Sequence, residues 1–227
     1  MKLHDTRWLI SALWLSAFLT VAGSSRAQPS DAEYAPIDRA IAAYATGDLP
    51  TALAGFERLS KQGLPLADYN LAMMHLRGET PTPSVTKALR LLERAAAKGL
   101  VVAQLSLGHI YEQGLLGKPD QALAVRWFRL AATAGDGEAQ LELATAYFLG
   151  RGVAKDWAMA ARWYREAANG GDVGAQYILA SMYEHGDGVD KDLRLARYWY
   201  DVAARNGDVA APSKCAELDA LLAAPPH

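Results

Sequence analysis

The sequence predicts an all-α fold in which short antiparallel helix pairs stack on one another as an α-solenoid. A pattern of 36 residues recurs four times without a gap between residues 67 and 210, and a fixed period of this length is typical of repeat architectures. The chain is also rich in alanine and poor in β-branched residues, which favours helix over strand. We therefore expect helix pairs that bury their apolar faces only by stacking on their neighbours.

The first 27 residues have the layout of an export signal. Basic residues precede an apolar stretch over residues 8–22, and small residues precede a cleavage point before Gln28. The apolar stretch suits a signal-peptide core and is short for a membrane span, which needs about 20 residues. We expect a cleaved secretory signal at 1–27 and a linker at 28–35. An uncleaved membrane anchor is the alternative.

The repeats occupy 67–102, 103–138, 139–174 and 175–210. Several columns recur in these four rows: a leucine column, a tyrosine column, two glycine columns and a tryptophan column. In the third row these positions are Leu143, Tyr147, Gly150, Gly171 and Trp163. So many matches in one register are not expected by chance, so every row should fold in the same way.

Each row reads as two helices. In the third row Ala139, Leu143 and Tyr147 are spaced by four residues and share one helical face. Gly150 is a helix stop because glycine accepts the left-handed conformation, and Asp156 is an N-cap for the second helix. The equivalent cap positions hold Ser84, Asp120 and Asp192.

The second helix of each row carries its own apolar face. Ala160, Trp163, Ala167 and Ala168 lie on one side of the helix in the third row. We expect the alanines to allow close helix approach and the tryptophan column to fill the core. On this interpretation, Trp163→Ala costs roughly 3–5 kcal/mol.

The 36-residue pattern resembles the Sel1-like repeat family, which is related to the tetratricopeptide repeat. The third row carries this resemblance at Ala139, Leu143, Ala144, Tyr147, Gly150, Gly152, Val153, Asp156, Ala160, Trp163, Ala167, Ala168 and Gly171. The first row departs from it, with His75 in the tyrosine column and Leu91 in the tryptophan column. The resemblance implies a right-handed superhelix whose first helices line a concave surface.

The ends of the solenoid differ from its middle. Residues 36–66, with Tyr44 and Phe56, look like a shorter tetratricopeptide-like helix pair that begins the stack. Residues 211–227 align with a first helix alone, so we expect a capping helix and tail. Cys215 falls in the leucine column and is expected to be buried, with a reactive thiol as the alternative.

No residue set in the sequence makes a convincing catalytic or metal site. Ser84 and Lys87 match the S-x-x-K motif of serine β-lactamases, but Ser84 occupies the helix-cap column and no S-D-N or K-T-G motif follows. A single cysteine excludes a disulfide within the chain and a cysteine metal cluster. We expect no enzyme activity, no metal and no cofactor.

The non-core positions of the first helices form a candidate groove for a partner. They mix polar side chains with methionine, which suits an adaptable peptide-binding surface. The candidate groove residues are Asn70, Met73, Met74, Arg77, Ser106, His109, Gln113, Glu142, Thr145, Ile178, Ser181, Met182 and His185.

The second helices carry a column of arginines. We expect these side chains to form a basic ridge, either as a solvated face with local acidic partners or as a docking strip for an acidic protein or an anionic glycan. The candidate ridge residues are Arg90, Arg126, Arg129, Arg162 and Arg165.

A net charge of −2 argues against a nucleic-acid binder, which normally carries a basic excess. We therefore expect an exported, periplasmic or secreted, non-catalytic scaffold that binds another protein or a peptide in the bacterial envelope. The family resemblance extends this to signalling, secretion or exopolysaccharide regulation. The alternatives are a glycan- or peptidoglycan-binding component and, more remotely, a β-lactamase-like hydrolase.

Overall fold

The computed structural model describes residues 31–115 and 117–223, and this part of the chain contains α-helices joined by turns and no strand. The helices are α1 (Asp31–Ala45), α2 (Leu49–Lys61), α3 (Pro65–Arg77), α4 (Val85–Ala97), α5 (Val101–Gln113), α6 (Gln121–Thr133), α7 (Gly137–Leu149), α8 (Trp157–Asn169), α9 (Val173–His185), α10 (Leu193–Arg205) and α11 (Ala211–Ala223). The all-α prediction is confirmed.

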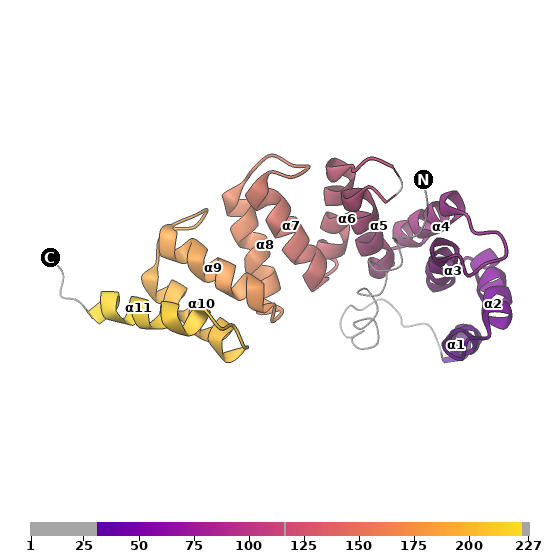
Figure 1. The fold of residues 1–227 in the computed structure, drawn as a ribbon, viewed down its shortest axis with the longest axis horizontal. Helices are drawn as coiled ribbons and strands as arrows, with labels where there is room; N and C mark the ends of the chain where they lie inside the picture. Colours follow the sequence, from indigo (N-terminus) through magenta and orange to yellow (C-terminus); the bar gives the residue numbers. More distant parts are fainter. Residues whose placement is uncertain (1–30, 116, 224–227) are drawn as a thin grey trace. The chain divides into compact units, whose positions relative to one another are not determined.

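The described residues form two compact units. Unit 1 extends to Ala95, and unit 2 begins at Ala96. In unit 2 the helices pack in chain order, α5 on α6, α7 on α8 and α9 on α10, and each pair packs on the next (Figure 1). The expected signal at 1–27 lies outside the described residues. Helix α1 begins at Asp31, so part of the segment expected as a linker is helical.

The predicted caps fix the helix boundaries. The carboxylates of Asp120, Asp156 and Asp192 accept hydrogen bonds from backbone N–H groups in the first turns of α6, α8 and α10, at 2.9–3.0 Å. Ser84 accepts the equivalent bond from the Lys87 N–H at 3.2 Å. The first helices end on left-handed glycines, Gly150 among them with φ 74°. Local sequence therefore sets where each helix starts and stops.

The core differs from the prediction in one column. The tryptophan column is only half-buried at Trp127, Trp163 and Trp199. The neighbouring column is buried instead, with Tyr164 3% exposed in the third row. Its members are Leu92, Phe128, Tyr164 and Tyr200. Adjacent residues on a helix point about 100° apart. The second helices are therefore rotated so that the residue after the tryptophan column, and not the tryptophan itself, faces the core.

A column of glutamines links successive repeats in unit 2. Gln140 donates a hydrogen bond to the Ala132 carbonyl at the end of the preceding helix, as Gln104 and Gln176 do to Ala96 and Ala168. Each of these carbonyls also accepts a backbone N–H from the glycine three residues later, so the glutamine side chain adds a second hydrogen bond at the helix end. The sequence carries this column as Gln104, Gln140 and Gln176, and the spacing of apolar residues does not reveal it.

In unit 1 an ion pair takes the place of the glutamine hydrogen bond. Asp68 stands in the glutamine column and its side chain is fully buried. Arg94 of α4 binds both of its carboxylate oxygens, with Nε 2.6 Å from Oδ2. The same guanidinium donates to the Ser60 hydroxyl at 2.7 Å and to the Ser60 carbonyl at 3.4 Å. Arg94 thus reaches the carbonyl that a glutamine at position 68 would otherwise bind.

The turn after each first helix packs on the helix before it. Gly152 has a φ of 66°, and a Cβ built on it would lie 2.1 Å from the Gln121 carbonyl oxygen. A Cβ built on Gly188, one repeat later, would lie 2.2 Å from the Trp157 carbonyl oxygen. Only glycine fits where the conformation is left-handed and the backbones approach so closely.

Helix α11 closes the C-terminal end of unit 2 by packing on α10. Cys215 is 9% exposed and Leu218 is fully buried in its inner face. Burial raises the pKa of the Cys215 thiol. The prediction that Cys215 is a buried packing residue is therefore confirmed.

Candidate functional site

Two hollows lie along the first helices of unit 2, at equivalent positions in successive repeats. The first lies between α5, α6 and α7 and is narrow, with a volume of about 10 Å³, which is about the space of one water molecule. The second lies between α7, α8 and α9 and is larger, with a volume of about 230 Å³. Most of their lining residues correspond one to one at an offset of 36 positions. The two hollows are thus one structural feature with different side chains.

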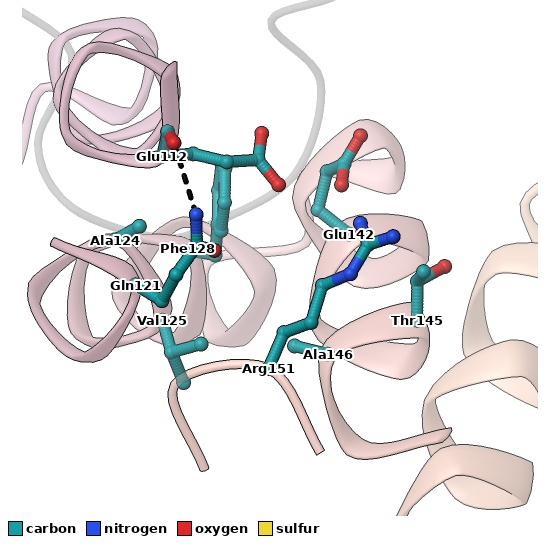
Figure 2. A pocket seen from close by; sticks show the side chains of 9 residues that line it. All are labelled: Glu112, Gln121, Ala124, Val125, Phe128, Glu142, Thr145, Ala146 and Arg151. Atoms are coloured by element: carbon teal, nitrogen blue, oxygen red, sulfur yellow. Dashed lines mark hydrogen bonds between the residues drawn. The ribbon is translucent and has the colours of Figure 1, made fainter. Parts of the chain in front are cut away.

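The first hollow is acidic, and we call it the acidic chamber. Glu112 from the end of α5 and Glu142 from α7 line it, and Figure 2 shows both at its rim with the Arg151 guanidinium pointing toward Glu142. Its floor is apolar and includes Phe128. The complete lining is Glu112, Gln121, Ala124, Val125, Phe128, Glu142, Thr145, Ala146 and Arg151.

A histidine and a third glutamate stand beside the acidic chamber. His109 Nε2 lies 3.0 Å from the Glu138 carboxylate, and its Nδ1 lies 3.7 Å from that of Glu112. Burial acts to lower the pKa of His109, but the bond to Glu138 and the surrounding carboxylates outweigh it, and the pKa is raised. Burial and the charge of Glu112 raise the pKa of Glu142. The glutamate carboxylates around the acidic chamber outnumber its cationic groups, so the chamber is net negative.

The second hollow is mainly aromatic and aliphatic, and we call it the aromatic chamber. The Phe148 ring packs edge-on against Tyr164, with centroids 6.4 Å apart, and is stacked on Trp157 at 6.2 Å. The Tyr164 hydroxyl lies 3.1 Å from the Thr145 hydroxyl, so these two side chains connect the chambers. The complete lining is Phe148, Tyr164, Tyr177, Ile178, Ser181, Met182 and Asp187.

The next equivalent position in unit 2 is filled by the protein itself. Glu184 and Lys214 follow Phe148 and Ile178 by one repeat, and the Lys214 ammonium lies 2.9 Å from the Glu184 carboxylate. Tyr200 donates a hydrogen bond to the same carboxylate at 2.7 Å. Burial acts to raise the pKa of Glu184, but these two bonds outweigh it and the pKa is lowered. The row of chambers ends at this ion pair.

The chambers contain part of the predicted groove. Glu142 and Thr145 line the acidic chamber, and Ile178, Ser181 and Met182 line the aromatic one. His109 stands beside the first, whereas Gln113 and His185 are exposed at helix ends.

Other predicted groove residues have structural roles. Met74 is 1% exposed and Ser106 is buried, because both turn inward between neighbouring helices. Met182 is 2% exposed and presents only an edge to its chamber. In unit 1 the Asn70 amide donates to the Leu66 carbonyl.

The remaining two predicted groove residues also belong to unit 1. Arg77 donates a hydrogen bond to the Tyr44 hydroxyl at 2.6 Å, and Met73 is half-buried. The Tyr44 hydroxyl in turn donates to the Glu79 carboxylate at 2.8 Å. This chain of bonds ties the end of α3 to α1.

Sequence reasoning missed several residues that line the chambers. Glu112 and Phe148 are separated by 36 residues at the ends of two first helices, and Arg151 follows in a turn. Tyr164 was not predicted because the adjacent Trp163 was expected to be the core residue. The 36-residue offset between Glu112 and Phe148 was a usable signal, since one column changes from acid to aromatic.

The arginines of the predicted basic ridge lie in two kinds of environment. The Arg129 guanidinium donates to the Tyr147 hydroxyl at 3.0 Å, and Arg165 donates to the Tyr183 hydroxyl at 2.6 Å. These arginines join each second helix to the first helix of the next repeat. Arg126 and Arg162 are exposed, and Arg162 lies over the Trp163 ring. Arg90, also exposed, belongs to unit 1.

The Ser84–Lys87 pair shows the geometry of a helix cap. The Ser84 hydroxyl accepts a hydrogen bond from the Lys87 backbone N–H. The Lys87 ammonium lies 3.8 Å from the Glu57 carboxylate at a solvent-exposed position. His75 is buried in unit 1 with Nδ1 3.1 Å from the Thr80 hydroxyl, and burial lowers its pKa.

Two further searches cover residues 31–115 and 117–223. Within these ranges no three His, Cys, Asp or Glu side chains are grouped in a way that would hold a metal ion. None of the helices described there combines the length and apolar character that a membrane crossing requires.

Comparison with known proteins identifies the repeat. The Sel1 repeat model matches residues 65–100, 101–136, 137–172 and 173–208, each match beginning two residues before the rows counted from Ala67. A protective antigen of uropathogenic Escherichia coli with an SLR fold is 35% identical over 82% of this chain and 41% of its own, with a TM-score of 0.72. A Sel1 repeat protein from Oxalobacter formigenes is 33% identical over 74% of this chain and 49% of its own, with a TM-score of 0.65.

The chain spans less than half the length of either of these solved structures. A search of curated proteins gives no match. The four repeat matches cover more than half of the 227 residues, and the helix pairs agree with them. The chain therefore belongs to the Sel1 repeat family.

Proposed function

We propose that this protein is a non-catalytic scaffold that binds an extended segment of a partner protein along the two chambers of unit 2. One observation carries the proposal: two open hollows occupy the same position in successive repeats but are lined by different side chains. Repeats that keep one core and vary one surface create extended binding surfaces. Sel1 repeats generally serve as interaction scaffolds, which supports this function.

A selection from a random peptide library displayed on phage tests this function. The purified protein is compared with Ile178→Glu, which places a charge in the aromatic chamber, and with Val209→Glu. Val209 is 94% exposed and outside both chambers, so it is a matched β-branched-to-glutamate control. We expect peptides that bind the wild type and the Val209 variant and lose affinity for the Ile178 variant. Selected peptides that bind all three proteins equally would refute the proposal.

We also propose that the protein is exported to the bacterial periplasm or beyond, and acts there in envelope signalling, secretion or exopolysaccharide regulation. The basic and apolar layout of residues 1–27 supports export. Mass spectrometry of the protein from fractionated bacteria should find an N-terminus at Gln28 in the periplasmic fraction. A chain that retains Met1 in the membrane fraction would favour the anchor instead.

A glycan is the second candidate ligand, and the aromatic chamber is the observation that favours it. Trp157 is 40% exposed and is stacked on Phe148 at its edge, and exposed aromatic rings are surfaces on which sugar rings pack. Titration with peptidoglycan fragments, followed by tryptophan fluorescence, tests this. A saturable change that Trp157→Ala removes would support the glycan, and the absence of any change would leave the peptide as the ligand.

A further inference from the structure

Resting on the proposed function, we infer that the bound segment is bipartite: it places the charged group of a lysine or arginine against the mouth of the acidic chamber and inserts a large apolar or aromatic side chain into the aromatic chamber. The two anchor residues lie within about six positions of each other in an extended chain.

The preference for a basic residue follows from the charges around the acidic chamber. Glu112, Glu138 and Glu142 contribute three negative charges and Arg151 one positive charge, which leaves a net −2 when His109 is neutral. Protonation of His109 reduces this to −1. The chamber remains complementary to a cation in both states, and a like-charged partner residue would be rejected.

A contact between an ammonium group and a carboxylate is already present in the molecule, one repeat beyond the aromatic chamber. Glu184 and Lys214 occupy the next equivalent position, and the Lys214 ammonium is held 2.9 Å from the Glu184 carboxylate beneath the Tyr200 hydroxyl. Glu184 is the repeat equivalent of Glu112. A carboxylate at the end of a first helix is therefore able to bind an ammonium group in this fold.

The preference for an apolar residue follows from the side chains that line the aromatic chamber. Phe148, Tyr164 and Tyr177 surround the aromatic chamber, with Ile178 and Met182 on α9. These rings supply edges and faces to a buried apolar side chain, and methionine adapts to its shape. Asp187 is the one carboxylate in this lining, so a charged side chain entering here would lose water without gaining an adequate partner.

The spacing follows from the repeat geometry. Successive first helices are separated by a second helix, since α5 packs on α6 and α6 packs on α7. Packed helices lie about 8–10 Å apart, so successive chambers are offset by up to about 16–20 Å. An extended chain advances about 3.3 Å per residue, so the two anchors lie within about six residues of each other. The Lys214–Glu184 pair fills the next position, which limits the segment to two anchors on that side.

Peptides selected by the wild-type protein test the inference through their sequences and through a second pair of variants. Glu112→Gln with Glu142→Gln removes the charge of the acidic chamber while keeping its shape. We expect groove-dependent peptides to carry a basic residue within about six positions of an apolar one. Synthetic copies, measured by fluorescence anisotropy, should lose at least about tenfold in affinity for the double variant. Exchange of the apolar anchor for alanine should cost about tenfold or more.

A conversion of chambers gives an independent readout. Glu112→Phe with Glu142→Ile gives the first chamber the side chains of the second at these two positions, and this variant should select peptides with two apolar anchors. Thermal unfolding of each variant establishes that it is folded before binding is measured.

The outcomes separate the two proposals. Groove-dependent peptides without a basic residue, or with unchanged affinity for the Glu-to-Gln double variant, would overturn the bipartite motif and leave the scaffold function standing. If no selected peptide depends on Ile178, the scaffold function fails and the bipartite motif fails with it.

Discussion

The ion pair between Asp68 and Arg94 provides a test of how the repeats are joined. Asp68 is fully buried, and Arg94 binds both of its oxygens while also reaching the Ser60 carbonyl. Arg94→Leu leaves a buried carboxylate without its cation. Removing one partner of a buried pair typically costs 3–5 kcal/mol. Because the Arg94 side chain is 47% exposed and water can reach the vacated space, we expect the lower end, about 3 kcal/mol.

The other repeats indicate a substitution that should compensate for the loss of Arg94. Gln104, Gln140 and Gln176 replace the aspartate there, and each donates to the carbonyl eight residues earlier. A glutamine at position 68 would find the Ser60 carbonyl in that place. The double variant Asp68→Gln with Arg94→Leu should therefore recover most of the stability lost by Arg94→Leu alone.

Thermal unfolding followed by far-ultraviolet circular dichroism measures both effects. About 3 kcal/mol corresponds to a shift of about 6–12 °C for a protein of this size. A wild-type midpoint for Arg94→Leu would refute the importance of the ion pair. A double variant as unstable as the single one would show that the glutamine column and the ion pair are not interchangeable.

Further predictions concern the core, a turn and a histidine. Tyr164→Ala should cost about 3–5 kcal/mol and Trp163→Ala about half as much, since only the first ring is fully buried; equal losses in urea denaturation would contradict the revised core. Gly152→Ala should lower the melting temperature and shift the backbone, because its Cβ would overlap the preceding repeat; an unchanged melt would show that the turn yields freely. The raised pKa of His109 means that its protonated form stabilises the fold below the unfolded pKa, a contribution lost as pH rises through the folded pKa. The lowered pKa of Glu138 means that its ionised form stabilises the fold above its own unfolded pKa. NMR titration should give a lower pKa for His109 in Glu138→Gln, and an unchanged value would remove Glu138 as its partner.

The period of the sequence was sufficient to predict the helix pairs. Asp156 caps α8 and Gly150 ends α7 as expected, because a cap bonds to backbone within three residues and a left-handed glycine acts on its own helix. The burial of Cys215 also followed from its column. These features are local, or repeat with the chain, so a single sequence contains them.

The identity of the buried ring and the lining of the two chambers were decided only by tertiary packing. Tyr164 and Trp163 are both aromatic and adjacent, and the rotation of α8 against its neighbours determines which one is buried. Glu112 and Glu142 share a chamber because α5 and α7 pack against α6. Their proximity depends on contacts between separate helices, and the linear spacing of residues on one helix cannot specify such contacts.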